Sequence, residues 1–294
     1  MQNANDVNFT KFFMGAVLVD DCLRGAHSLG KRLESELLLG RVLKMSRESL
    51  FAHPECLLSE DEWNEYDLLW KRVKAGEPIA YILGQKEFFG LDFKVDARVL
   101  IPRPETEHLV EAVLDLVKEV ENPRILDVGT GSGAIALALA HTLPQARVWA
   151  SDVSGAALEV ARENALHLNC ERVEFFESDV LSHLEWESWD LDVLVANLPY
   201  IGTEIFDFVE KSVKEYEPHG ALFGGVDGLE LYAQLFEQIK CSITGVKPRW
   251  ILGEFGALQQ EAMATLIARF FPLSSVTFHQ DLAGLDRFFI LRNL

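Results

Sequence analysis

Apolar residues recur every three or four positions in the first part of the chain. The spacing holds between residues 33 and 43 and again between residues 63 and 73, and it is the period of an amphipathic helix. Ser59 followed by Glu62 resembles a capping box at the start of the second helix. The Gly-Glu-Pro run at residues 76–78 ends that helix. We therefore predict a small helical domain over residues 1–78.

The pattern changes over residues 79–101, where short apolar pieces alternate with turn residues. Residues 81–84 and 88–95 resemble strand pieces joined by tight turns. We predict a β-hairpin linker over this stretch, joining the helical domain to a larger domain over residues 102–294. A helix is predicted to start at Glu105, directly after two prolines that favour a helix start.

Short apolar runs alternate with helical patterns from residue 124 onward. The predicted strands are residues 124–128, 147–153, 172–176, 191–196 and 249–253, and the predicted helices are residues 133–142, 154–169, 229–243 and 257–271. Such alternation is typical of a parallel sheet with helices on both faces. Residues 276–279 and 287–291 are predicted to form a closing hairpin. The predicted fold class is α/β, a Rossmann-like, mostly parallel sheet with a C-terminal antiparallel hairpin, preceded by the helical domain.

The net charge of −19 narrows the choice of substrates. Residues 1–80 carry 10 Lys and Arg against 13 Asp and Glu, and the remaining residues carry 17 against 33. The larger domain is therefore strongly acidic, and an acidic surface repels phosphate backbones. We expect no direct contact with nucleic acid, although a local basic groove could survive on an acidic protein.

Cysteine and apolar patterns bear on metal binding and on compartment. The four cysteines are scattered without a CxxC pair and the histidines show no HxxxH spacing, so no metal is assigned. Scattered thiols fit a cytoplasmic location.

Residues 12–19 form an apolar run with acids on both sides, which favours a buried helix face over a secretory signal. No run reaches membrane-spanning length, so no membrane partner is expected.

A glycine-rich loop joins the first predicted strand of the larger domain to its helix. Its candidate cofactor-binding residues are Asp127, Gly129, Thr130, Gly131, Ser132 and Gly133. Glycines let the backbone approach a ligand closely, and N–H groups at a helix start bind anionic groups. Asp152 ends the next strand, where its carboxylate can accept hydrogen bonds from both ribose hydroxyls. The pattern predicts a nucleotide-like cofactor.

Two kinds of cofactor fit this loop. The Gly-x-Gly-x-x-Ala spacing from Gly129 matches a dinucleotide fingerprint. Asp127 before the glycines favours S-adenosylmethionine instead, because it can bind the amino acid portion. Asp179 and Val180 follow the third strand, where the carboxylate can accept from an adenine amino group and the valine can flank the ring. A helix cap or a solvated acid explains Asp179 equally well.

The motif Asn197-Leu198-Pro199-Tyr200 follows a predicted strand at the side of the sheet where α/β proteins bind ligands. The Asn197 amide oxygen can accept one N–H of an incoming NH₂ group, and the Leu198 carbonyl can accept the other. Pro199 stiffens the turn, and Tyr200 offers its ring face to a planar group. We predict methyl transfer to nitrogen by positioning, with Asn197 and Tyr200 as the catalytic residues. Taken alone, the motif also fits an ordinary Asn-Pro turn.

With the glycine loop, this motif resembles the class I amino-group methyltransferases. Further stretches resemble one branch, the HemK/PrmC protein-(glutamine-N5) methyltransferases that act on peptide chain release factors. They are residues 88–91, 100–107, 216–225, 227–229 and 281–287. The resemblance runs over roughly the whole chain, and the motifs are specific together.

The resemblance implies methylation of the glutamine in a Gly-Gly-Gln loop, with S-adenosyl-L-methionine as cofactor. It implies that residues 129–133, Asp152, Val180 and Asn197 bind the cofactor, that residues 197–200 bind the substrate, and that the helical domain docks the release factor. Leu198 stands where the family usually has proline, a change that keeps the carbonyl acceptor. We expect a monomer.

Two other functions remain open from the residues. A nucleic-acid adenine methyltransferase would use the same grip on a planar NH₂ group after flipping its base, but the negative charge disfavours it. A non-enzymatic, cofactor-sensing interaction protein would keep only the fold. Such a scaffold has no need of Asn197 and Tyr200.

Overall fold

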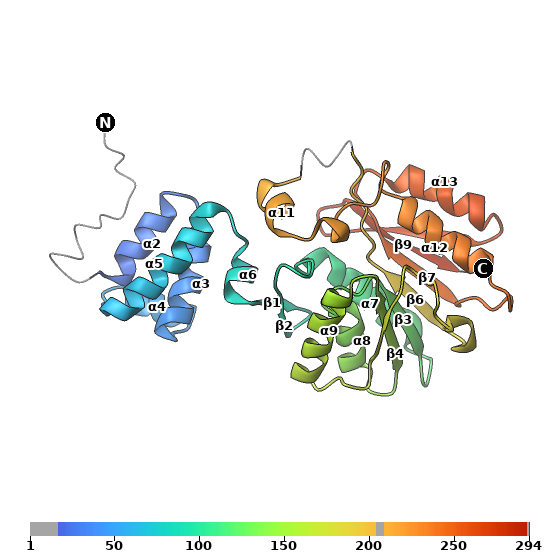
Figure 1. The fold of residues 1–294 in the computed structure, drawn as a ribbon, viewed down its shortest axis with the longest axis horizontal. Coiled ribbons are helices and arrows are strands. Elements are labelled where there is room, and N and C mark those ends of the chain that lie inside the picture. Colours follow the sequence, from blue (N-terminus) through green and yellow to red (C-terminus); the bar gives the residue numbers. More distant parts are fainter. Residues whose placement is uncertain (1–16, 204–208, 293) are drawn as a thin grey trace. The chain divides into compact units, whose positions relative to one another are not determined.

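The structure is a computed structural model that describes residues 17–203, 209–292 and 294. Its contacts divide the chain into two compact units, Met1–Gly84 and Gln85–Leu294, drawn in Figure 1. The predicted domain boundaries at residues 78 and 101 stay a proposal. Of the helices in the part of the chain that is described, none has the length and apolar character to cross a bilayer. Most of the apolar run at residues 12–19 lies outside the described residues.

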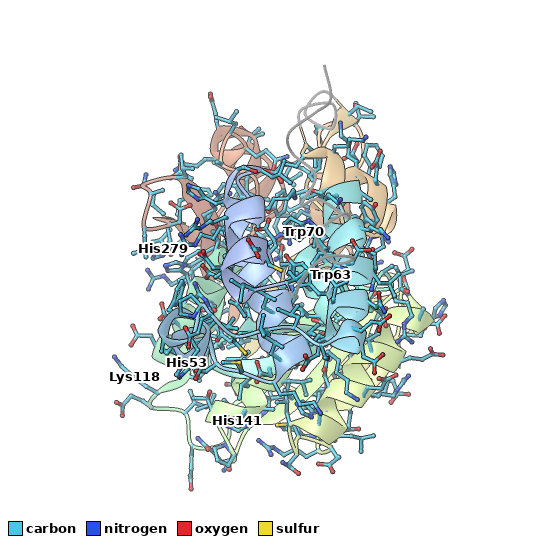
Figure 2. The ribbon with its side chains drawn as sticks, turned by 90° about the vertical axis from the view of Figure 1, so that its left-hand side faces the viewer. His53, Trp63, Trp70, Lys118, His141 and His279 are labelled. Carbon is cyan, nitrogen blue, oxygen red and sulfur yellow. The ribbon has the colours of Figure 1, made fainter. Side chains whose placement is uncertain are left out.

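The first unit is helical. It comprises α2 (Val19–His27), α3 (Arg32–Leu43), α4 (Arg47–Ala52), α5 (Glu60–Ala75) and α6 (Ile79–Leu83). Trp63 and Trp70, both on α5 and labelled in Figure 2, are buried in a core with apolar residues of α2 and α3. The predicted capping box is present, because the Ser59 hydroxyl accepts from the Glu62 N–H and the Glu62 carboxylate accepts from the Ser59 N–H.

One predicted element of the linker is wrong. Residues 81–84 are not a strand piece, because Tyr81 lies in the single helical turn α6, which begins after Pro78 and ends at Gly84 with φ 73°. The fixed φ of proline suits a helix start, and glycine readily takes the left-handed conformation that ends one. The hairpin consists instead of β1 (Gln85–Phe88) and β2 (Leu91–Lys94). Its two turn residues both have positive φ, as a type I′ turn requires.

The second unit is built on a seven-stranded sheet with the order β5-β4-β3-β6-β7-β9-β8. Its strands are β3 (Arg124–Val128), β4 (Arg147–Asp152), β5 (Glu174–Glu177), β6 (Val193–Ala196), β7 (Trp250–Glu254), β8 (Ser275–Gln280) and β9 (Asp286–Arg292). Strands β3 to β7 pair in parallel, whereas β9 pairs antiparallel with β7 and with β8. The predicted fold class is confirmed, including the closing hairpin.

Helices cover both faces of this sheet (Figure 1). They are α7 (Glu107–Val117), α8 (Ala134–Thr142), α9 (Gly155–His167), α12 (Glu230–Lys240) and α13 (Gln260–Phe270); shorter elements are η1 (Pro104–Thr106), η2 (Trp186–Ser188), α11 (Lys211–Tyr216) and η3 (His219–Ala221). Along β6, Val193 and Val195 pack in the core with α7 and α8, while Leu194 and Ala196 pack in the core with α12 and α13. A strand buried on both faces is expected for a parallel sheet between helical layers.

Candidate functional site

The glycine-rich loop lies at the carboxyl end of β3. Gly129, Gly131 and Gly133 all have left-handed φ angles, between 56° and 83°. A side chain at Gly133 would also meet Leu137 Cδ1 at 2.8 Å, so the loop requires glycine there for both conformation and space. The N–H groups that begin α8 are thereby placed next to the carboxyl end of the sheet, which suits an anionic group.

Asp127 is buried beneath this loop with only one of its oxygens in use. Its Oδ2 accepts from the Thr130 hydroxyl at 2.6 Å and from the Ala136 N–H at 3.1 Å. Its Oδ1 is buried and has no hydrogen-bond partner among the described residues. Burial raises the pKa of this carboxyl to about 7. A buried acceptor without a donor fits a ligand that brings N–H groups.

Asp152 ends β4 and is tied to the loop through backbone donors. Its Oδ2 accepts from the Gly131 N–H at 2.8 Å, and its Oδ1 accepts from the Ser154 N–H at 2.9 Å. Burial raises its pKa. Because each carboxylate oxygen has a further lone pair, Asp152 can still accept from a diol. The next side chain, Val153, is 65% exposed beside it.

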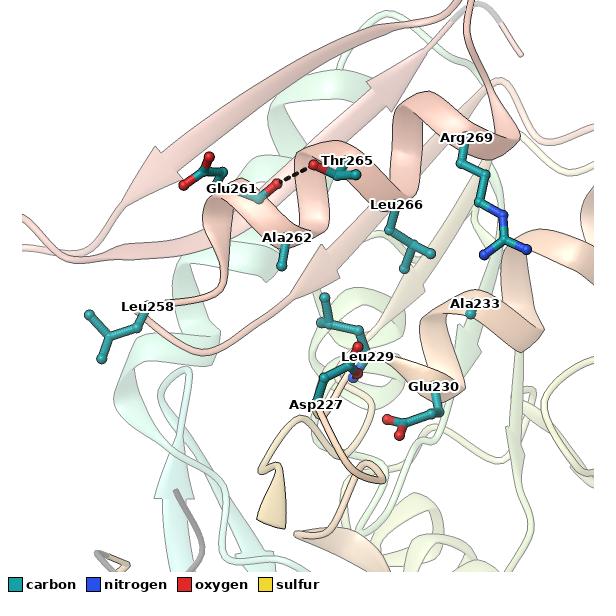
Figure 3. A pocket seen from close by; sticks show the side chains of 10 residues that line it. All are labelled: Asp227, Leu229, Glu230, Ala233, Leu258, Glu261, Ala262, Thr265, Leu266 and Arg269. Carbon is teal, nitrogen blue, oxygen red and sulfur yellow. Dashed lines mark hydrogen bonds between the residues drawn. The ribbon is translucent and has the colours of Figure 1, made fainter. Parts of the chain in front are cut away.

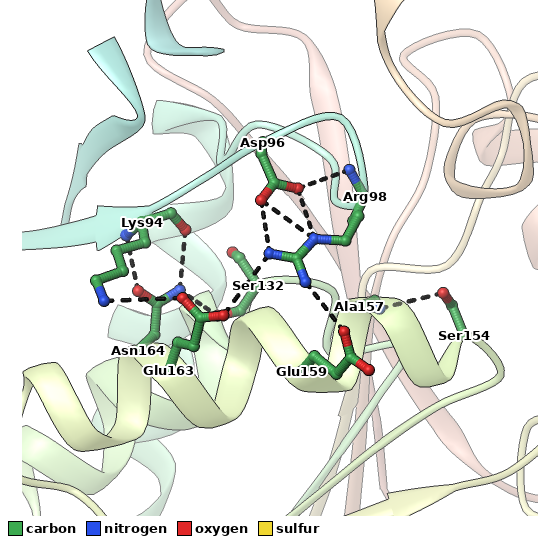
Figure 4. Close-up of polar contacts among 9 residues, drawn as sticks. All are labelled: Lys94, Asp96, Arg98, Ser132, Ser154, Ala157, Glu159, Glu163 and Asn164. Atoms are coloured by element: carbon green, nitrogen blue, oxygen red, sulfur yellow. Dashed lines mark hydrogen bonds and ion pairs between the residues drawn. The ribbon is translucent and has the colours of Figure 1, made fainter. Parts of the chain in front are cut away.

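Asn164 on α9 fixes the other side of the loop (Figure 4). Its Nδ2 donates to the Ser132 carbonyl at 2.9 Å and to the Lys94 carbonyl at 3.0 Å, while its Oδ1 accepts from the Lys94 N–H at 2.7 Å. The side chain is fully buried, so its donors and its acceptor are all satisfied by backbone groups. The glycine loop is therefore held to β2 through α9.

Asp179 and Val180 follow β5 but have other neighbours in the structure. The exposed Asp179 accepts from Gln234 Nε2 at 3.1 Å. Val180 is buried in the core with α12 and has φ 55°, an uncommon conformation for a β-branched residue. The Ser178 N–H donates to the Asp152 carbonyl at 2.9 Å, which brings this turn to the end of β4. No contact between Asp179 or Val180 and the glycine loop is among the described hydrogen bonds.

Asn197 follows β6, beside the glycine loop, and its amide nitrogen is held by two side chains. Nδ2 donates to Thr106 Oγ1 and to Glu254 Oε2, each at 3.1 Å. The Asn197 backbone carbonyl would lie 3.9 Å from a methyl group placed on Gly129. The predicted transfer motif and cofactor loop are therefore neighbours at the same edge of the sheet.

Leu198 of the transfer motif is buried against the glycine-rich loop. A methyl group on Gly129 would approach Leu198 Cδ2 to 3.0 Å, so the leucine fills the space against the loop. Its N–H lies near the hydroxyl of Tyr232 and acts to lower the pKa of that phenol, which burial raises. That hydroxyl in turn donates toward the carbonyls of Ala196 and Glu254, at 3.1 and 2.6 Å. Proline at position 198 would lack this N–H.

Tyr200 is held through its side chain and through its backbone. Its hydroxyl donates to Glu254 Oε1 at 3.2 Å, and its backbone carbonyl accepts from Gln259 Nε2 at 2.9 Å. Burial and the neighbouring Glu254 carboxylate raise the pKa of the phenol, so Tyr200 stays neutral near pH 7. Arg103 forms an ion pair with the buried Glu217 at 2.5 Å.

Glu254, at the carboxyl end of β7, is a residue that sequence reasoning missed. Its buried carboxylate accepts from Thr106 Oγ1 at 2.7 Å, besides the bonds from Asn197 and Tyr200. Burial raises its pKa. The signal that could have found it is its position, because an acid directly after a predicted strand lies at the same edge as Asn197.

Other pockets lie away from these residues. One of about 620 Å³ opens between α12 and α13 (Figure 3), and among the described residues its lining includes Leu229, Leu258 and Leu266 but none of the predicted site residues. A search of the described residues finds no cluster of three or more His, Cys, Asp and Glu side chains that could hold a metal ion.

Comparison with known proteins identifies relatives of both units. The family model of the PrmC N-terminal domain matches residues 19–84, and that of the methyltransferase small domain matches residues 106–226. A Koribacter versatilis protein named release factor glutamine methyltransferase is 45% identical, over 80% of this chain and 82% of its own length. A Coxiella burnetii protein of the same name is 41% identical over 89% of this chain and 91% of its own.

Solved structures resemble this chain at much lower identity. The human Mettl16 catalytic domain, in complex with an RNA hairpin, has a TM-score of 0.58 at 17% identity and covers 73% of this chain and 81% of its own. The N-terminal domain of human METTL16 in complex with SAH has a TM-score of 0.52 at 18% identity and covers 76% of this chain and 83% of its own. Similarity at this level shows a shared fold and carries no information about the substrate.

Proposed function

The chain belongs to the family of release factor glutamine methyltransferases, and from this premise we propose its reaction. It transfers a methyl group from S-adenosyl-L-methionine to the side-chain amide nitrogen of the glutamine in the Gly-Gly-Gln motif of a peptide chain release factor. Relatives named for this activity align over most of the chain at 36–45% identity. The observation that carries the proposal is Asn197, whose bound amide nitrogen leaves its oxygen to accept from a carboxamide beside the cofactor loop.

The residues at the carboxyl ends of β3 and β4 fit the cofactor. Asp127, with its buried unpartnered Oδ1, would hold the ammonium group of the methionine portion. The N–H groups of residues 129–133 would bind its carboxylate, and Asp152 would accept the ribose hydroxyl protons. Asp179 and Val180 would flank the adenine. The cofactor supplies an electrophilic methyl group on its sulfonium sulfur.

The motif after β6 prepares the nitrogen that receives the methyl group. An amide nitrogen is a weak nucleophile because its lone pair is delocalised. The Asn197 amide oxygen accepts one N–H of the glutamine side chain and the Leu198 carbonyl accepts the other, which fixes the direction of the lone pair. Catalysis then rests on positioning and electrostatics. As the nitrogen would take the methyl group from the sulfonium sulfur, the product would be left with one proton in excess, which it sheds to solvent after the transfer. The Tyr200 phenol stays neutral because its pKa is raised. It offers its ring face to the glutamine amide and neither gives nor takes a proton during the transfer.

The proposal includes the partners of the enzyme. The helical unit docks the release factor, the enzyme acts as a monomer in the cytoplasm, and it touches neither membrane nor nucleic acid. The charge of −19 supports the last point against an adenine methyltransferase. Size-exclusion chromatography with light scattering tests the monomer, and deletion of residues 1–84 tests docking, since it should raise the KM for the release factor more than the dissociation constant for the cofactor.

The decisive experiment uses purified release factors and isotopically labelled S-adenosyl-L-methionine. The Gly-Gly-Gln peptide of the treated factor is expected to gain one methyl group on its glutamine, as read by tandem mass spectrometry. A release factor with that glutamine changed to alanine is the control and should take up no label. Label on DNA or RNA oligomers, with none on the release factor, would overturn the proposal.

A further inference from the structure

The amide nitrogen of the Asn197 carboxamide is bound within the protein. Nδ2 donates to Thr106 Oγ1 and to Glu254 Oε2, each at 3.1 Å, and because these two oxygens lie only 2.7 Å apart, they share one N–H of the carboxamide. The amide oxygen is therefore the end of the side chain that can accept from a substrate. If the carboxamide were turned over, its oxygen would face the Glu254 carboxylate, and two acceptors would repel each other.

The Glu254 carboxylate decides which partner donates in each hydrogen bond of this group. An ionised carboxylate has no proton to donate, so Thr106 must donate its hydroxyl proton to Oε2, at 2.7 Å. The Thr106 oxygen is then free to accept from Asn197. Tyr200 donates to the second carboxylate oxygen, Oε1. One buried carboxylate thus orients the two residues of the transfer motif that would touch the glutamine.

The partners come from elements far apart in the chain. Thr106 ends η1 at the start of α7, Glu254 ends β7, and Asn197 follows β6. Asn197 and Glu254 lie at the carboxyl edge of the sheet because β6 and β7 are parallel neighbours, and Thr106 is hydrogen-bonded to both. Arg287 and Glu105 are the charged residues that act on Glu254 from β9 and η1. A cluster built from four elements is more rigid than a turn, as positioning requires.

We propose that Glu254 and Thr106 are positioning residues for methyl transfer, which fix the Asn197 carboxamide with its oxygen toward the substrate. The inference rests on the proposed function for its effect on rate. The hydrogen bonds themselves can be measured without any reaction.

The first test observes the Asn197 side chain by NMR. Its pair of side-chain NH₂ signals is assigned by its loss in Asn197→Ala. In the wild-type protein these protons should exchange slowly with water, because Nδ2 donates to two buried acceptors. In Thr106→Val they should exchange at least about tenfold faster, as expected when one acceptor is lost. Unchanged exchange in Thr106→Val would overturn the inference whether or not the protein methylates release factors.

The second test measures kcat, the KM for a release factor and the cofactor dissociation constant. Thr106→Val should lower kcat about tenfold and Glu254→Leu about a hundredfold, because a misoriented Asn197 no longer aims the glutamine nitrogen. KM and cofactor affinity should change by less than about threefold. Thr106→Ser keeps the hydroxyl and should restore the rate to within about twofold.

Glu254→Gln separates the acceptor from the charge. A glutamine oxygen can accept from Thr106 and Asn197 while its NH₂ donates to the Tyr200 oxygen, so kcat should fall by less than about fivefold. Glu261→Gln and Thr265→Val are matched controls on the surface of α13, where the Thr265 hydroxyl bonds only within its own helix (Figure 3).

The outcomes separate the inference from the proposed function. A wild-type protein that methylates no release factor refutes the function, while the NMR result still decides the hydrogen bonds. An active wild type with normal kcat in folded Thr106→Val refutes the positioning role. If Glu254→Leu does not fold, as judged by thermal unfolding, the rates of Thr106→Val and Thr106→Ser alone decide whether the positioning role holds.

Discussion

The cofactor side and the transfer side of the site are held together in different ways. On the cofactor side, Asp127 and Asp152 are bound chiefly by backbone N–H groups from positions within 21 residues in the chain. On the transfer side, Asn197 and Tyr200 are held by the side chains of Thr106 and Glu254, from positions 54 to 91 residues away. A binding loop can be built locally, whereas the orientation of one carboxamide needs the finished fold.

The largest effect on the transfer side is expected when the Asn197 carboxamide is removed. Asn197→Ala should lower kcat by more than about a hundredfold, because the substrate loses an acceptor that places its nitrogen. Cofactor affinity should be largely kept, within about threefold, since the backbone N–H groups of the glycine loop remain. Quenched-flow rates and calorimetry measure the two. Full activity in this variant would refute the role of Asn197.

The opposite effect is expected on the cofactor side. Asp152→Ala should weaken cofactor binding by about 1–3 kcal/mol, as for the loss of a charge-assisted hydrogen bond. At saturating cofactor, kcat should remain near that of the wild type. Titration calorimetry checks the affinity, with Asp190→Ala on the exposed surface as control. Unchanged affinity would remove Asp152 from the cofactor site.

A third prediction uses the buried Asp127, whose pKa is raised to about 7 by burial. Between its ordinary value of 3.8 and about 7, the folded state binds more protons at this group than the unfolded state does. Its contribution to the free energy of unfolding therefore decreases as pH rises through this window.

Asp127→Asn removes this titration. The stability of the wild type relative to the variant should fall by at least about 1 kcal/mol from pH 4 to pH 7, at 1.36 kcal/mol per unit of pKa shift. Urea unfolding of both proteins without cofactor, at a series of pH values, measures the difference. A difference that is constant with pH contradicts the prediction.

The smallest effect should come from restoring the residue usual in the family. Leu198→Pro removes the N–H that lies near the Tyr232 hydroxyl and the side chain that packs on Gly129. We expect a loss of about 1–2 kcal/mol of stability and less than about threefold change in kcat, because the carbonyl acceptor remains. Thermal unfolding and steady-state rates check both. A tenfold loss of rate would show that the leucine side chain itself positions the substrate.

The same contrast explains what the sequence predicts well. The alternation of apolar runs predicts the strands and helices of the sheet, and the fold class is confirmed. Asp127 and Asp152 are recognisable because a short chain segment carries the whole pattern of glycines and acids. Their roles as cofactor ligands stay predictions, as do those of Asp179 and Val180.

Long-range partners left a weaker signal. The position of Glu254 directly after a predicted strand places it at the same edge as Asn197, but no pattern joins it or Thr106 to Asn197, because the partners meet only in the finished fold. The error over residues 81–84 has a local cause, since four apolar or small residues fit a strand and a single helical turn equally well. Pro78 and Gly84 decide between the two through their φ angles.

Tyr232 connects this site to α12, one of the helices that cover the sheet. Its hydroxyl donates to the carbonyls of Ala196 and Glu254, the residues that end β6 and β7, and so ties both strand ends to α12. Because Tyr232 belongs to α12, a change in the packing of that helix, for instance at Leu235, would alter the gap between Asn197 and Glu254. Slow variants of this protein should therefore also arise from interior positions on α12 that no ligand ever reaches.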